Sequence, residues 1–114
     1  MKEKIALIRT DLAMIKNAMS RYRKGLEGFN RKLFDISFNK VLAAKHSVEM
    51  DGMEMIMMHR SLNMYAHALS KAGKRIEAEH YYRLSKWIDQ TRARFQQTYG
   101  PKIEKAASAA TLTA

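Results

Sequence analysis

Apolar residues recur at helical spacing along most of this chain, and that periodicity constrains the fold more than any other feature. In the first segment, successive apolar residues are 3, 4, 3, 4 and 3 positions apart: Ile5, Ile8, Leu12, Ile15, Met19 and Tyr22. This is the pattern of a helix with one buried seam. The spacing predicts a first helix over residues 2–24 that ends at Gly25, because glycine is a common helix terminator.

Three further helices are predicted by similar patterns. We expect a second helix from Asn30 to about residue 50, a third over 53–72 and a fourth over 75–98. Asp51-Gly52 indicates a turn, although it can also be a kink in one long helix formed by the second and third segments. With only 5 Gly and 1 Pro in 114 residues, a turn-rich β fold is disfavoured. The expected fold is all-α: an up-and-down antiparallel bundle of about four helices over residues 1–100, with 101–114 as a flexible or partly helical tail.

The third and fourth predicted helices carry small and aromatic residues at positions typical of a helical hairpin. These positions are Leu62, Tyr65, Ala66, Leu69, Gly73, Ala78, Tyr82 and Ser85. Over residues 59–92 the pattern resembles a tetratricopeptide (TPR) hairpin, within the pair of helices expected at 53–98. Gln90 stands where that repeat has a proline, and the flanking segments do not repeat the pattern, so a generic antiparallel hairpin is the alternative. The resemblance implies a protein-binding scaffold without catalytic chemistry.

The chain is strongly basic, with 21 Lys+Arg against 11 Asp+Glu and a formal net charge of +10. In an up-and-down bundle, the first and third turns lie at the same pole. That pole would gather eight cations: Arg21, Arg23, Lys24, Arg31, Lys32, Lys71, Lys74 and Arg75. A basic pole predicts salt-sensitive contact with the phosphates of nucleic acid or with another polyanion. The alternative is a solvated face that serves only solubility.

Methionines concentrate in the third predicted helix and suggest a second function. Six fall within fifteen residues: Met50, Met53, Met55, Met57, Met58 and Met64. Because methionine is flexible and polarizable, it suits both core filling and adaptable contact surfaces. The candidate partner-binding residues are Met53, Met57, Met64, Trp87 and Arg94. The corresponding alternative function is a protein-binding adaptor or inhibitor, with the positive charge steering encounter with an acidic partner. A third is a homo-oligomer, for example a homodimer, along the seams of the first and fourth helices.

Signals for catalysis, metal binding and membrane insertion are weak or missing from the sequence. There is no Cys, and no Gly-rich phosphate loop of the P-loop or dinucleotide type. Glu77 and His80 have the helical spacing of di-iron carboxylate bundles, but the further ligands that such a site needs have no counterpart. We therefore expect no enzyme activity, no metal and no cofactor. Without a signal peptide or a long apolar segment, we expect a cytoplasmic protein and no membrane partner.

Overall fold

The computed structural model describes residues 1–99 and contains four helices and one two-stranded sheet. In chain order the elements are β1 (Glu3–Ala6), α1 (Arg9–Arg23), α2 (Gly28–Ala43), β2 (Ser47–Met50), α3 (Gly52–Lys71) and α4 (Arg75–Tyr99). The prediction of a mostly helical chain with four helices is confirmed. The expected tail, 101–114, lies outside the described residues.

The predicted first and second helices were too long, because β1 and β2 occupy residues that were predicted to be helical. β1 pairs antiparallel with β2, placing Ile5 opposite Val48 and Lys4 opposite Glu49. Ile5 and Val48 are buried, whereas Lys4 and Glu49 are exposed, which is the alternation of a sheet with one covered face. Ile8, assigned to the helical seam, is 66% exposed and precedes α1. Residues 3–6 form a strand and not the start of a helix, because the partner strand supplies the backbone hydrogen bonds that a helix would otherwise provide.

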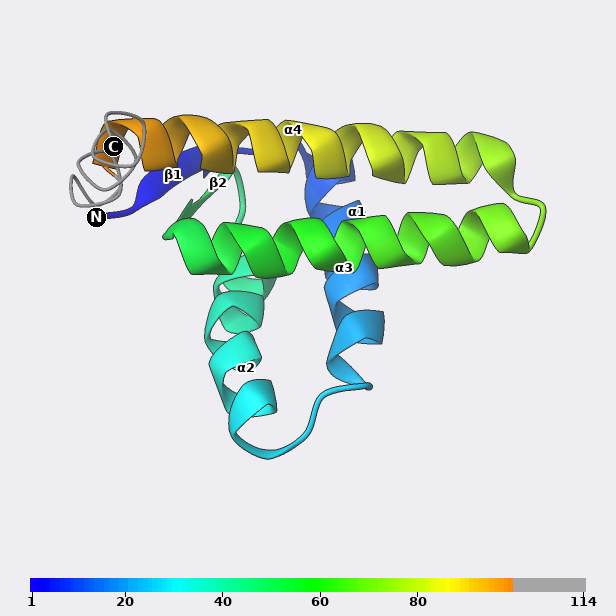
Figure 1. Ribbon diagram of the computed structural model, residues 1–114, viewed down its shortest axis with the longest axis horizontal. Helices are drawn as coiled ribbons and strands as arrows, with labels where there is room; N and C mark the ends of the chain where they lie inside the picture. The colour runs from blue at the N-terminus through cyan, green and yellow to red at the C-terminus, as the bar shows by residue number, and fades with distance from the viewer. Residues whose placement is uncertain (100–114) are drawn as a thin grey trace, which may run out of the picture.

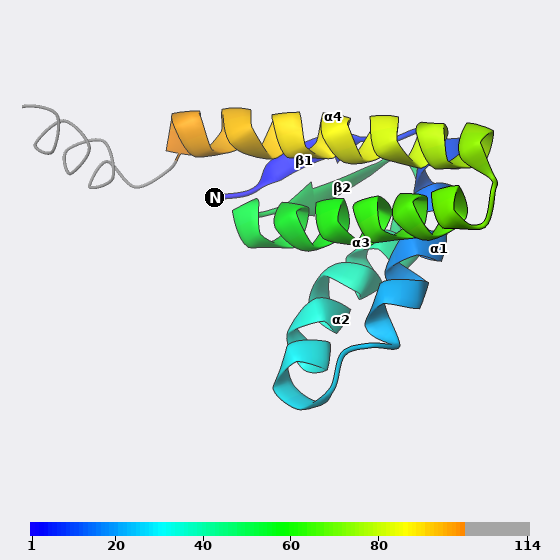
Figure 2. The same ribbon diagram turned by 45° about the vertical axis from the view of Figure 1, so that its right-hand side comes forward.

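The four helices form two antiparallel pairs that cross each other. α3 and α4 lie side by side along the long axis of the molecule, and α1 and α2 run steeply across them (Figures 1 and 2). Antiparallel packing therefore holds within each pair, but the four helices do not share one axis. As a result, the α1–α2 turn and the α3–α4 turn lie at different ends of the molecule (Figure 1). The single basic pole expected from an up-and-down bundle is not formed.

The ends of α3 are set by local side-chain and backbone chemistry. At its start, the Asp51 carboxylate accepts a hydrogen bond from the Glu54 N–H at 2.8 Å, and Glu54 accepts one from the Asp51 N–H at 3.1 Å. This reciprocal capping box makes Asp51-Gly52 a true helix boundary and not a kink. At its end, Gly73 has φ +82° and the Lys74 N–H donates to the Leu69 carbonyl at 2.9 Å, which terminates the helix as a Schellman motif.

The core lies where the two helix pairs cross. Its largest fully buried side chains come from both pairs and from the sheet, including Ile5, Ile15, Met19, Phe34, Met50, Met55, Met58, Leu62 and Ile88. The apolar seams of α1 and α4 are thus used inside one chain. Association of copies along these seams stays a prediction, and of the α1 seam Ile8 is exposed at the surface.

An ion pair and a ring contact hold α1 against α2. The Arg23 guanidinium donates to both carboxylate oxygens of Asp35, with Nη2 at 2.9 Å from Oδ2. Beside this pair, the rings of Tyr22 and Phe34 lie 5.4 Å apart between their centroids. The hydrogen bond from Arg23 has the largest effect and lowers the pKa of Asp35; burial opposes it, and the nearby charges of Arg23 and Arg31 lower the pKa further.

We expect Asp35→Asn to lower the melting temperature at neutral pH but not in strong acid. Because the pKa of Asp35 is lower in the folded chain than in the unfolded chain, the ion pair stabilises the fold above the ordinary Asp pKa of about 3.9. This stabilisation is lost as the pH falls through the lowered pKa. Thermal melts of both proteins at about pH 7 and about pH 2 test this, and an equal difference at both pH values would contradict it.

Candidate functional site

The structure brings two of the predicted nucleic-acid-binding residues together in a hollow between α1 and α3. This α1–α3 crevice has a volume of about 530 Å³ and is lined by Arg21 from α1 and by His67 and Lys71 from α3. Tyr22 and Tyr65 form part of its wall. Both helices contribute residues that recur every three or four positions, as expected where two helices present one face each. A concave site thus lies where α1 crosses α3.

Aromatic side chains position the cationic wall of the crevice. The Arg21 guanidinium carbon lies 5.8 Å from the centre of the Tyr65 ring, within the range of a cation–π contact. Tyr65 in turn packs against Tyr81, with 4.6 Å between the ring centroids. Tyr22 is half-buried. Arg21 is thus held on the wall while its side chain remains exposed to a ligand.

Among residues 1–99, the charged side chains that line the crevice, Arg21 and Lys71, are both positive. Arg21 and Lys71 are exposed, and no carboxylate side chain from residues 1–99 is part of the lining. Both cations also stand in the last turn of their helices, where positive charge complements the partial negative charge of the helix end. An anionic ligand in the crevice would therefore meet two exposed cations and, among residues 1–99, no carboxylate in the wall.

The other six predicted cations are not part of the crevice lining. Arg23 is engaged with Asp35. Lys24 is exposed directly after α1, next to the crevice, while Arg31 is half-buried on α2 and Lys32 is exposed there. Lys74 and Arg75 are exposed at the α3–α4 turn, which projects from a different side of the molecule than the α1–α2 turn (Figure 1).

Three of the predicted partner-binding residues lie along one side of α3. Met53 and Met64 are 63% and 61% exposed, and Met57 is half-buried. Met53 and Met57 line a second hollow of about 570 Å³ together with Leu33 and Ile36 of α2, which we call the α2–α3 groove. Sequence reasoning did not assign Leu33 and Ile36 to a site. The available signal was that α2 carries more apolar residues than one buried stripe requires.

The α2–α3 groove and the α1–α3 crevice adjoin each other. Tyr22 and Leu26 line both hollows, so the two form a continuous recessed surface between α3 and the α1–α2 pair. Met64 lines the crevice, while Met53 and Met57 line the groove.

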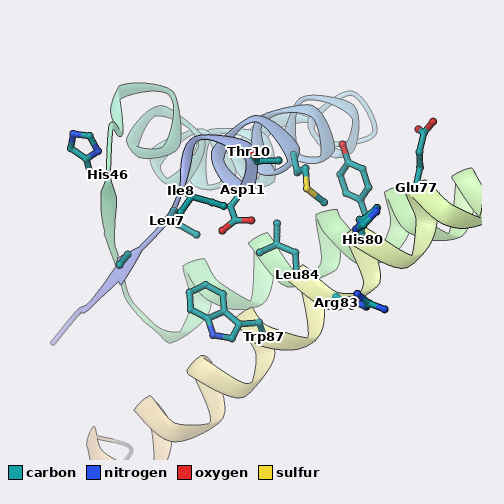
Figure 3. Close-up of a pocket in the computed structure, with 13 residues that line it drawn as sticks. Leu7, Ile8, Thr10, Asp11, His46, Glu77, His80, Arg83, Leu84 and Trp87 are labelled. Carbon is teal, nitrogen blue, oxygen red and sulfur yellow. The ribbon is translucent and has the colours of Figure 1, made fainter.

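Trp87, the fourth predicted partner-binding residue, lies on a different surface. It lines a third hollow, of about 770 Å³, between α4 and the start of α1, near Ile8 and Leu84 (Figure 3). Trp87 is 38% exposed. The side chains around this hollow carry both signs of charge, with Asp11 and Glu77 opposed by Arg83, so charge does not select a class of ligand.

Arg94 lines none of the three hollows described above, while His46 and His80 line the third hollow together and His67 lines the crevice. Arg94 is exposed further along α4, where its guanidinium lies 3.4 Å from the Thr91 hydroxyl. His59 is joined to the Ser85 hydroxyl at 2.8 Å, which links α3 to α4. Among residues 1–99, no three His, Asp or Glu side chains are grouped so that they could hold a metal ion.

Among residues 1–99, no helix is long and apolar enough to cross a membrane.

Three comparisons with known proteins give no indication of the fold or the function of this chain. No protein-family model matches the sequence, and comparisons with curated proteins and with solved structures give no significant match.

Proposed function

We propose that this protein is a small, basic, non-enzymatic binding protein that engages nucleic acid through the α1–α3 crevice. The observation that supports this most directly is the meeting of Arg21 and Lys71, from two different helices, in one hollow with tyrosines in its wall. Lysine and arginine provide affinity for phosphate without sequence preference. Lys24 is exposed, three positions after Arg21 and next to Gly25 of the lining, and in this proposal it extends the same surface.

The shape of the crevice favours single-stranded over double-stranded nucleic acid. A recess of about 530 Å³ can accept an unstacked base, whereas the bases of a duplex are already paired and stacked. Tyr65 and Tyr22 supply aromatic surface near the cations. In this proposal Arg23 has a structural role through its pair with Asp35, while Lys74 and Arg75 assist only on longer strands that pass the end of α3.

A titration of labelled oligonucleotides tests this function. We expect a single strand of about 20 nucleotides to bind with micromolar or tighter affinity at low salt, and more tightly than a duplex of the same sequence. With about three phosphates neutralised, the log–log salt slope should be near −2, which weakens binding by about 20-fold between 50 and 200 mM salt. Fluorescence anisotropy at these two salt concentrations gives both quantities. Tighter binding of the duplex, or affinity independent of salt, would contradict the proposal.

Protein binding is the second candidate function, and the exposure of Met53 and Met64 favours it. Single large apolar residues at a surface are common, but a row of them along one helix indicates a contact surface. The TPR resemblance of α3 and α4, proposed over residues 53–98, would fit the same function. A cytoplasmic location stays a prediction.

A further inference from the structure

We propose that the α2–α3 groove docks an amphipathic helix of a partner protein whose polar face is acidic. This inference rests on the second candidate function, protein binding, and does not depend on nucleic-acid binding in the crevice. Its support comes from the apolar floor of the groove, the charges at its rim and its position between two helices.

Apolar side chains from two helices form the floor of the α2–α3 groove. On α2, Leu33 and Ile36 are three positions apart and are 43% and 57% exposed. On α3, Met53 and Met57 are four positions apart and face the same hollow. These spacings place each pair on one side of its helix. The groove is thus lined by two apolar side chains from each of the two helices.

The α2 part of this apolar surface, Leu33 and Ile36, does not belong to the hydrophobic core. α2 contributes Phe34, Ser37 and Val41 to the interior, and these three residues are fully buried. Leu33 and Ile36 precede two of them by one position, so each points about 100° away from the buried stripe. Exposing such aliphatic residues gives the isolated fold no hydrophobic stabilisation, whereas covering them with a partner would.

The geometry favours a helix as the occupant. A groove between two helices accepts a third helix that inserts apolar residues at i, i+3 or i+4, and i+7. The α3 residues that line the groove, from Met53 to Arg60, extend about 10 Å, or two helical turns, which matches the separation of residues i and i+7 of a docked helix. Methionine adapts its shape to such inserted side chains. A nucleic-acid base would instead favour aromatic platforms, whereas Leu33, Ile36, Met53 and Met57 are not aromatic, and Tyr22 lines the groove only where it joins the crevice.

The charges around the groove favour acidic residues on that helix. The two carboxylates in the lining are engaged locally: Asp51 caps α3, and buried Glu54 pairs with Lys40 at 2.8 Å. Lys2 and Arg60, which also line the groove, are exposed. Where the groove joins the crevice, the cations of the crevice extend the positive surface. Acidic side chains beside the apolar anchors would therefore meet complementary charge.

A set of three matched peptides tests the proposal on the full chain. The first is a labelled helical peptide of about 16 residues with Leu anchors at i, i+4 and i+7 and Glu on its other face. In the second, every Glu is replaced by Lys, and in the third every Leu is replaced by Ser. We expect the first peptide to bind with micromolar affinity in anisotropy titrations, and each control to bind at least about tenfold more weakly.

Two isoleucine variants localise the binding. Ile36→Ser should weaken the first peptide by at least about fivefold, because it removes an apolar side chain from the groove floor. Ile76→Ser is the matched control, since Ile76 is 80% exposed on α4 and should leave affinity unchanged. Thermal melts confirm that both variants are folded.

The other outcomes separate this inference from the functions proposed above. Equal binding of the Lys peptide would overturn the acidic preference while leaving protein binding in place. Equal binding of the Ser peptide, or an equal effect of both isoleucine variants, would overturn docking in the groove. If no peptide binds but Ile36→Ser weakens binding of a single-stranded oligonucleotide, the groove belongs to the nucleic-acid surface and the inference is wrong.

Discussion

Replacing Phe34 with Ala is expected to lower the free energy of unfolding by about 3–5 kcal/mol. Phe34 is fully buried, and its ring centroid lies 5.4 Å from that of Tyr22 and 6.2 Å from that of Phe38. Truncation removes the ring from the contact that joins α1 to α2 and leaves a cavity that close packing cannot fill. Urea denaturation followed by circular dichroism measures the change.

The matched control for this prediction is Phe29→Ala on the same helix. Phe29 is 72% exposed, so the same substitution should change the free energy of unfolding by no more than about 0.5 kcal/mol. Similar losses for the two variants would contradict the placement of α2, because they would require Phe29 and Phe34 to be buried alike.

The double reversal Arg21→Glu with Lys71→Glu is expected to weaken single-stranded oligonucleotide binding by at least about tenfold at low salt. Each substitution removes one phosphate contact and adds a repelling carboxylate to the crevice wall. The loss of two contacts should also make the salt slope shallower by about 1.4. Anisotropy titrations at several salt concentrations measure both effects.

A second pair of reversals controls for the change in net charge. Lys45→Glu with Lys86→Glu alters the net charge equally at two exposed positions that do not line the crevice. We expect this pair to weaken binding by no more than about threefold at the same salt concentration, because the interaction of a charge with a bound phosphate falls with distance and neither position lines the crevice. Equal weakening by both pairs would show that total charge, not the crevice, determines binding. Thermal melts should accompany both, since Arg21 and Lys71 also complement helix ends.

The helices were predictable wherever local chemistry determines them. The capping box at Asp51 and the helix end at Gly73 each depend on a few adjacent residues. The predicted starts and ends of the last two helices accordingly fall within one residue of those of α3 and α4. The seam of the first helix was correct from Leu12 to Met19, where those side chains are buried.

The strands and the site depended on long-range contacts that local patterns do not record. Ile5 pairs with Val48 from a distant segment, and four residues are too few for an alternation to outweigh a helical period. Arg21 and Lys71 were both predicted as binding residues, but for a shared pole. What brings them together is the steep crossing of α1 over α3 (Figure 1), and an interhelical angle depends on how ridges of side chains pack, not on apolar spacing alone.

The most direct test of the central claim is an NMR titration of the isotope-labelled protein with a short single-stranded oligonucleotide. The account predicts that backbone amide shifts change mainly over residues 18–26 of α1 and its following turn and over 61–71 of α3, the two segments that line the crevice. Amides over 80–94 of α4 should change little. Shifts concentrated on α4, or no shift changes at low salt, would contradict the assignment of the α1–α3 crevice as the nucleic-acid site.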